Sequence, residues 1–190
     1  MSYLVTAGSL LLDLVFGALT LLFVLRVALQ VARAGFQDPL SQFVYRASNP
    51  VLAPLRRLLR PVGRFDVAAA AVAWLIQCLK VVALFALAGM APAFAGVLVL
   101  GLAELAGLVL TLFFWIIIIA VVLSFLGSPH HPLVPLIDRL AAPWLRPFRR
   151  LLPPLGGIDL SPLLACVAIL LARILLVAPL GDLGTRLATG

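Results

Sequence analysis

The chain has 190 residues, of which 64% are hydrophobic and only 11% are charged, with a mean hydropathy of +1.22. A soluble domain has about 25% charged residues. Too few polar groups remain here to cover a soluble globule, which excludes an ordinary cytosolic enzyme, a disordered chain and a fibrous repeat and leaves an integral membrane protein. The net charge is +7, and ten of the 14 basic residues lie in two loop regions, as is typical of cytoplasmic loops rather than of nucleic-acid binding.

Four apolar segments are long enough to cross a bilayer, which needs about 20 residues. They are residues 4–32, 67–87, 94–126 and 162–180. The first has no basic start and no small-residue cleavage site, so we expect it to remain in the mature protein. The predicted fold class is an all-α integral membrane protein with four transmembrane helices.

Two basic regions, 33–66 and 128–159, join the first span to the second and the third to the fourth. No basic side chain precedes the first span, and in the C-terminal tail Arg186 is balanced by Asp182. Because basic loops stay in the cytoplasm, we expect both regions there and both termini outside.

The two basic regions are copies of one sequence. Residues 39–66 align with residues 132–159 without a gap, at an offset of 93, and 13 of the 28 positions are identical. The chain is therefore predicted to be a tandem duplication, with one repeat at 1–92 and the other at 93–190. Each repeat has two spans, so the copies are parallel and not inverted as in many transporters. The shared prolines, glycines and aspartates are Pro50, Pro54, Pro61, Gly63 and Asp66 in the first copy and Pro143, Pro147, Pro154, Gly156 and Asp159 in the second.

Apolar residues recur at helical spacing within each loop, with arginines between them. We expect the prolines to prevent one continuous helix and to leave two short amphipathic helices that meet at a bend in the headgroup plane. Simple interfacial anchoring is one interpretation of these loops. The other is a site that docks lipid headgroups or a protein, because paired arginines hold phosphate in a forked geometry. The candidate docking residues are Arg56, Arg57, Arg149, Arg150 and Trp144.

Asp66 and Asp159 stand where the second and fourth spans begin, which predicts a cap at each start, formed by Asp66 in the second span and by Asp159 or Ser161 in the fourth. Gly63 and Gly156 precede them and give the chain the freedom to turn.

Charged residues also fall inside the predicted spans, where they are costly and face a partner or water. Each repeat has an acid on its first span and a base on its second: Asp13 with Lys80, and Glu104 with Arg173. Ion pairs that join the helices are the simpler interpretation, and a polar path for protons or ions is the alternative. Arg26 is near the cytoplasmic end of the first span, so we expect it to extend to the interface.

No motif predicts catalysis or a cofactor. His130 and His131 have no acid or thiol beside them, Cys78 and Cys166 lie within apolar runs, and there is no nucleophile elbow, P-loop or glycine fingerprint. We therefore expect no enzyme activity, no metal and no cofactor.

The motif DPLSQF at 38–43 and the two loops of the form NP/AP-x-x-x-P-[LF]-R-R-L-L that end in G-x-x-D resemble the YggT family of small inner-membrane proteins of bacteria, which has plastid relatives. The resemblance covers nearly the whole chain. The first copy departs from the pattern, since Arg60 stands where a proline would follow the leucine pair and alanines replace the Ser-Pro region after Asp66.

The resemblance implies a role in the cell envelope, with links to cell division and osmotic tolerance in bacteria and to cytochrome b6f assembly and nucleoid distribution in plastids. It brings no catalytic residues. The sequence thus predicts a non-enzymatic scaffold or assembly factor of the inner membrane, with anionic lipids, a membrane or cytoplasmic protein and a second copy as partners and no nucleic acid. The alternative is a small ion channel or transporter subunit that uses the intramembrane charges.

Overall fold

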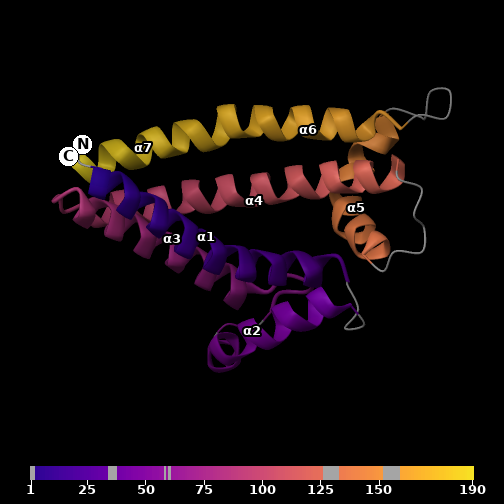
Figure 1. Cartoon of the computed structure of the whole chain (residues 1–190), viewed down its shortest axis with the longest axis horizontal. Coiled ribbons are helices and arrows are strands. Elements are labelled where there is room, and N and C mark those ends of the chain that lie inside the picture. The colour runs from indigo at the N-terminus through magenta and orange to yellow at the C-terminus, as the bar shows by residue number, and fades with distance from the viewer. Residues whose placement is uncertain (1–2, 34–37, 58, 60, 126–132, 152–158) are drawn as a thin grey trace.

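The computed structural model describes residues 3–33, 38–57, 59, 61–125, 133–151 and 159–190. These residues form helices, and within them the only extended pairing is an isolated bridge between Val62 and Phe65. Figure 1 shows the long helices lying along one direction. They are α1 (Tyr3–Val31), α3 (Val67–Leu87), α4 (Phe94–Phe125) and the continuous run of α6 (Ser161–Ala172), η1 (Arg173–Val177) and α7 (Ala178–Thr189).

These four helical runs are long and apolar enough to cross a membrane, which confirms the predicted fold class. Both chain termini and the turn between α3 and α4 lie at one end of the bundle, here called the terminal end (Figure 1). Two shorter helices, α2 (Pro39–Leu55) and α5 (Val134–Leu151), follow α1 and α4 at the other end. We call that end, with the loops that follow these two helices, the basic end.

The fourth span is longer than the sequence predicts, because α7 continues to Thr189 and includes the residues that we assigned to a tail. Small residues allow α7 to pack closely on α4. A Cβ atom on Gly96 would lie only 2.3 Å from the backbone of Ala188, and one on Gly184 would lie 2.8 Å from the Leu100 side chain. Small residues at a contact let helix backbones approach within a membrane, so Gly184 allows α7 to pack on α4 and does not end the helix.

The prediction of two short helices in each loop is wrong: α2 and α5 are each one helix, with two prolines inside. The prolines of each pair are four residues apart, so they share one helix face. The ring of the second proline then faces the backbone carbonyl of the first proline. The helical hydrogen bonds that the two prolines cannot donate are therefore all missing on one side of the helix. That side is exposed in both helices, where polar surroundings can solvate the carbonyls. The residues concerned are Pro50, Pro54, Pro143 and Pro147.

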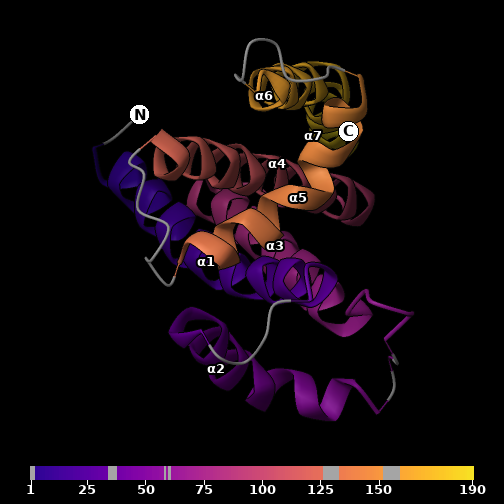
Figure 2. The ribbon, with the colours of Figure 1, turned by 90° about the vertical axis from the view of Figure 1, so that its right-hand side faces the viewer.

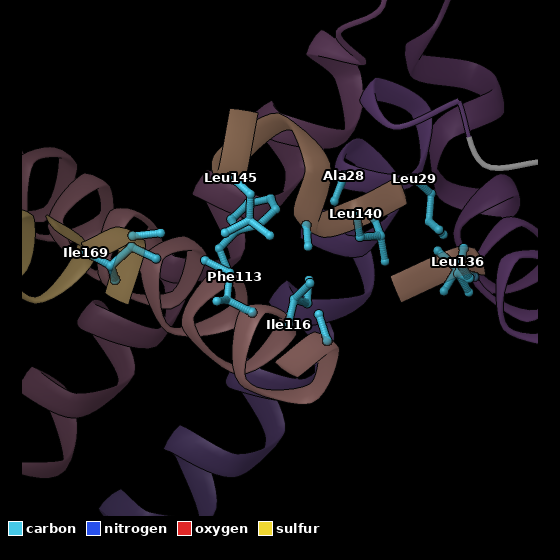
Figure 3. Close-up of a cluster of buried hydrophobic side chains, with 13 residues drawn as sticks. Ala28, Leu29, Phe113, Ile116, Leu136, Leu140, Leu145 and Ile169 are labelled. Atoms are coloured by element: carbon cyan, nitrogen blue, oxygen red, sulfur yellow. The ribbon is translucent and has the colours of Figure 1, made fainter. Parts of the chain in front are cut away.

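Helix α5 crosses the basic end of the bundle, as Figure 2 shows. Its apolar face enters the largest hydrophobic cluster, which joins α5 to α1, α4 and α6 and so connects the two repeats. In Figure 3, Leu136 and Leu140 of α5 lie beside Leu29 of α1, and Phe113 and Ile116 of α4 lie across from them. The second loop helix is therefore part of the core of the bundle as well as of its surface.

Candidate functional site

One contact between arginine and aspartate occurs in both repeats. The Arg56 guanidinium donates to the Asp66 carboxylate, and the Arg149 Nε donates to Asp159 Oδ2 at 3.0 Å. These residues are repeat equivalents, since both members of each pair are offset by 93. The contact closes the loop between the amphipathic helix and the next span, and it engages the first arginine of each pair.

Both aspartates bond to the backbone at the start of the following span, but only Asp66 is the N-cap that the sequence predicts, since the N-cap of α6 is Leu160. Asp66 is the N-cap of α3 and accepts a hydrogen bond from the Ala69 backbone N–H at 3.2 Å. Asp159 precedes α6 and accepts from the Ser161 N–H at 2.9 Å. Burial raises the pKa of Asp159, but the hydrogen bonds from Ser161 and Arg149 outweigh it and hold the pKa below the ordinary aspartate value. The carboxylate is thus ionised at neutral pH.

Arg26 completes the first copy of this cluster, and the expectation that it extends to the interface is wrong. Its side chain is only 2% exposed and lies 3.8 Å from the Asp66 carboxylate. Its guanidinium donates to Ser48 at 3.5 Å and to Asn49 at 3.4 Å, and it lies 3.5 Å from the centre of the Tyr45 ring. Helix α2 covers Arg26 with these polar and aromatic groups, which gives the buried cation the partners that a buried charge requires.

The loop of the first repeat turns tightly before Asp66. Val62 and Phe65 exchange two backbone hydrogen bonds of 3.1 and 3.0 Å, and Gly63 between them has φ +59°, a conformation that glycine adopts without strain. This is the turn for which the sequence predicts Gly63, and Pro61 lies exposed beside it. Pro154 and Gly156 of the second copy lie outside the described residues.

The second arginine of each pair is placed differently from the first. Arg57 and Arg150 are exposed, and neither guanidinium makes an ion pair or hydrogen bond with any residue that the structure describes. Trp144, which the sequence groups with them, is instead half-buried and packs against Phe113 with ring centroids 4.4 Å apart. Among the docking candidates, Arg57 and Arg150 are therefore the exposed arginines whose side chains are not held by an aspartate, while Trp144 belongs to the core.

A cavity of about 440 Å³ lies between α1, α3, α4 and α5 at the basic end. Its volume is within the roughly 300–1,000 Å³ of small-molecule sites, and its lining is apolar, including Val27, Phe65 and Trp144. Pro143 of α5 also lines it. Arg139 and Arg146 are exposed and stand one turn to either side of Pro143 on the same helix face. No sequence motif predicts this cavity, because it forms where the two repeats meet.

The intramembrane charges meet in one cluster across three spans. Lys80 Nζ on α3 lies 3.1 Å from Asp13 on α1 and 2.6 Å from Glu104 on α4. Lys80 thus pairs with the acids of both repeats, whereas the sequence suggests one pair in each repeat. Arg173 is exposed at the start of η1, and none of the described carboxylates lies within ion-pair distance of it.

Sequence reasoning missed a second polar contact in the same seam. Gln77 of α3 and Thr20 of α1 are both buried, and the Gln77 amide donates to the Thr20 hydroxyl at 3.2 Å. The sign of this contact in the sequence is that Gln77 and Thr20 are polar residues inside apolar runs. The seam between α1 and α3 therefore carries polar groups at three levels: the Lys80 cluster, the Thr20 contact and the Arg26 cluster.

The described residues contain no group of three or more histidine, cysteine or acidic side chains placed to hold a metal ion. Cys78 and Cys166 are free thiols on different helices, and His130 and His131 lie outside the described residues.

Four apolar spans, with the arginine–aspartate contact repeated at an offset of 93, define a tandem-repeat membrane protein of four spans. A family model described as CCB3/YggT matches residues 5–87 and again residues 99–180, one region in each half of the chain. The chain belongs to the CCB3/YggT family.

Three bacterial relatives are similar over most of their length. An uncharacterised protein of Pseudomonas aeruginosa is 39% identical over 165 residues, which cover 85% of this chain and 84% of that protein. An uncharacterised protein of Vibrio alginolyticus is 35% identical over 170 residues, 88% of this chain and 92% of that protein. The uncharacterised protein YggT of Escherichia coli K12 is 34% identical over 154 residues, 81% of this chain and 80% of that protein. No solved structure matches the chain.

Proposed function

We propose that this protein is a non-enzymatic scaffold or assembly factor of the bacterial inner membrane. Its basic end faces the cytoplasm and docks a protein partner on the anionic leaflet, and its termini face outward. The observation that carries the proposal is the division of each arginine pair. Arg56 and Arg149 close their loops on aspartates, while Arg57 and Arg150 remain exposed at the basic end.

This division supports docking because an arginine held by a carboxylate within its own chain is engaged, whereas an exposed one is available to an anionic partner. Each arginine pair thus has one guanidinium held by an aspartate and one exposed, where the sequence suggests a forked pair. Each arginine near an anionic leaflet adds about 1 kcal/mol of attraction, so the exposed arginines also favour the orientation with this end in the cytoplasm.

The cavity at the basic end leads us to include a bound lipid in the proposal. We propose that it takes an acyl chain of an anionic phospholipid, because its walls are apolar and because Arg139 and Arg146 flank Pro143 on its α5 wall. The acyl chain would fill the space between the repeats while the headgroup meets the guanidinium groups. A lipid held in this way would fix α5 against α1, α3 and α4 and keep the docking surface in place.

The proposal is tested by in-cell photo-crosslinking from a photoreactive residue at Leu151, which adjoins Arg150 and is 72% exposed. We expect a discrete protein adduct that is lost when Arg57→Gln and Arg150→Gln are combined. Adducts with lipid alone would overturn the scaffold function and reduce the loops to membrane anchors. A probe at exposed Phe94, at the terminal end, is the control that should not give this adduct.

We extend the proposal to the two processes that the family resemblance implies, cell division and tolerance of osmotic shock. Deletion of the gene should then slow recovery from an osmotic upshift or disturb septum placement, and a copy with Arg57→Gln and Arg150→Gln should fail to restore the normal phenotype. Full restoration of the normal phenotype by that copy would show that these two processes do not depend on Arg57 and Arg150.

A second candidate function is a small ion channel or transporter subunit, favoured by the three levels of polar groups along the α1–α3 seam. Purified protein in proteoliposomes should then conduct protons or ions, and Lys80→Met should abolish the flux while Leu79→Met, at an exposed neighbour, should not. Flux that is indistinguishable from that of empty vesicles would exclude this function.

A further inference from the structure

The two loop helices have equivalent apolar faces in different surroundings. On α5, Leu136 and Leu140 are 1% and 2% exposed, and they lie beside Leu29 on α1 of the other repeat (Figure 3). At the repeat offset of 93, the same positions of α2 are Phe43 and Ala47. Phe43 is 65% exposed, and Ala47 is exposed on the same helix face. Helix α2 therefore leaves uncovered the face that α5 packs against the neighbouring repeat.

The two helices do not differ in how they pack on their own repeats. Leu52 of α2 is buried in a cluster with α1 and α3, and its equivalent Leu145 of α5 is buried in a cluster that includes α4 and α6. The difference between the repeats is thus confined to the side of each loop helix that points away from its own spans. On that side α5 meets another repeat, and α2 does not.

Helix α4 has an uncovered surface that matches the one α5 uses on α1. Counted back from the last residue of each helix, Val122 and Ile119 of α4 correspond to Ala28 and Leu25 of α1. Ala28 and Leu25 pack in the cluster that contains α5. Val122 and Ile119 are instead 49% and 42% exposed, and Trp115, one turn further along the same face, is 57% exposed.

We infer that a second copy of this chain covers both surfaces: α2 of one copy packs on the last turns of α4 in the next copy, as α5 packs on α1 within the chain. Lipid also solvates apolar side chains, so exposure alone does not select this partner. What selects it is the equivalent contact, which the chain already makes between its own repeats. Both surfaces lie at the basic end (Figure 1), so copies inserted in the same orientation bring them together head to tail.

The inference is tested by disulfide crosslinking in native membranes, with full chains that carry Cys78→Ala and Cys166→Ala. One copy has Ala47→Cys and one tag, and the other has Val122→Cys and a second tag. We expect an oxidant to give a dimer that carries both tags when the two copies are expressed together. Neither copy expressed alone should give this dimer, because the contact joins two different surfaces.

Two controls are matched to these probes. Ala28→Cys and Leu140→Cys in one chain are the equivalent pair within the monomer, where both residues line the same cavity. Their intrachain disulfide shows that this kind of contact brings two thiols together. The second control replaces Ala47→Cys by Ala53→Cys, which is exposed on another face of α2 and is the equivalent of the exposed Arg146. It should give no mixed dimer.

A larger apolar residue distinguishes packing between copies from contact with lipid. Ile119→Trp lies on the proposed α4 surface, where lipid accommodates the added bulk but a closely packed helix does not. We expect the mixed dimer to fall about tenfold or more, which corresponds to roughly 1.4 kcal/mol of association. Leu102→Trp, at an exposed α4 position nearer the terminal end, should leave the yield unchanged.

Absence of the mixed dimer, while the intrachain pair still forms, would overturn the inference and leave lipid as the cover of both surfaces. Equal yields from the Ala53→Cys control, or an unchanged yield in Ile119→Trp, would overturn it as well. All of these chains keep Arg57 and Arg150, so this inference and the proposed scaffold function fail separately.

Discussion

At the scale of the residue, the same aspartate performs the same task in two different environments. Asp66 is fully buried between Arg26 and Arg56, whereas Asp159 is 41% exposed and pairs with Arg149 alone. A buried charge that loses its partner is far more costly than an exposed one. The first loop is therefore held by a buried network and the second by a surface pair.

Replacing each aspartate by asparagine removes the negative charge and keeps the bond to the helix start, because asparagine caps a helix as well as aspartate does. The loss of stability then shows how much the charge contributes at each site. Asp66→Asn leaves the buried Arg26 and the half-buried Arg56 without a counter-ion, and we expect it to lower the free energy of unfolding by about 3–5 kcal/mol. Asp159→Asn should lower it by only about 0–1 kcal/mol. Thermal unfolding of the purified protein in detergent measures both, and equal losses would contradict the assignment of a buried network to the first repeat.

At the scale of the element, hydropathy and the internal repeat predict the four spans, the helical and amphipathic character of the loop segments and the cap of α3, because each of these depends on local sequence. The prolines of α2 and α5 lead to a wrong prediction of two short helices in each loop. Their effect on a helix depends on which helix face is exposed, and tertiary packing determines that face. Arg26 misleads for a related reason: α2 folds back over α1 and buries it. The cavity and the pairing of Lys80 with Glu104 depend on how the two repeats meet, which no single segment contains.

The packing of α4 against α7 gives a prediction at this scale. Gly96→Ala would place a Cβ atom 2.3 Å from the Ala188 backbone, and backbone has little freedom to move away. We expect a loss of about 1–3 kcal/mol in the free energy of unfolding, as for other overpacked sites. The control is Gly17→Ala on α1, where nothing lies within 4 Å of the new atom. Equal melting temperatures for the two variants would show that α7 does not pack on α4 at this position.

At the scale of the whole molecule, the two ends of the bundle differ in charge. The basic end holds the amphipathic helices and their exposed arginines, and the terminal end holds both termini and an uncharged turn (Figure 1). One side of the membrane therefore meets nearly all the exposed positive charge, which supports the proposed orientation.

Cysteine labelling in whole cells tests that orientation. In a chain with Cys78→Ala and Cys166→Ala, we expect Met90→Cys in the α3–α4 turn to react with a membrane-impermeant maleimide added outside. Arg64→Cys, in the exposed loop before α3, should react only after the membrane is opened. The reverse pattern would place the basic end outside and remove the basis for cytoplasmic docking.

In the proposed function, the two arginines of each pair have different tasks: one closes the loop and the other docks a partner. The most direct measurement is the yield of the protein adduct from a photoreactive residue at Leu151, compared between Arg149→Gln and Arg150→Gln at equal protein levels. The two substitutions are adjacent and chemically identical. We expect Arg150→Gln to lower the yield about fivefold or more, roughly 1 kcal/mol of binding, and Arg149→Gln to leave it nearly unchanged. Equal yields in both variants, or a loss confined to Arg149→Gln, would contradict the claim.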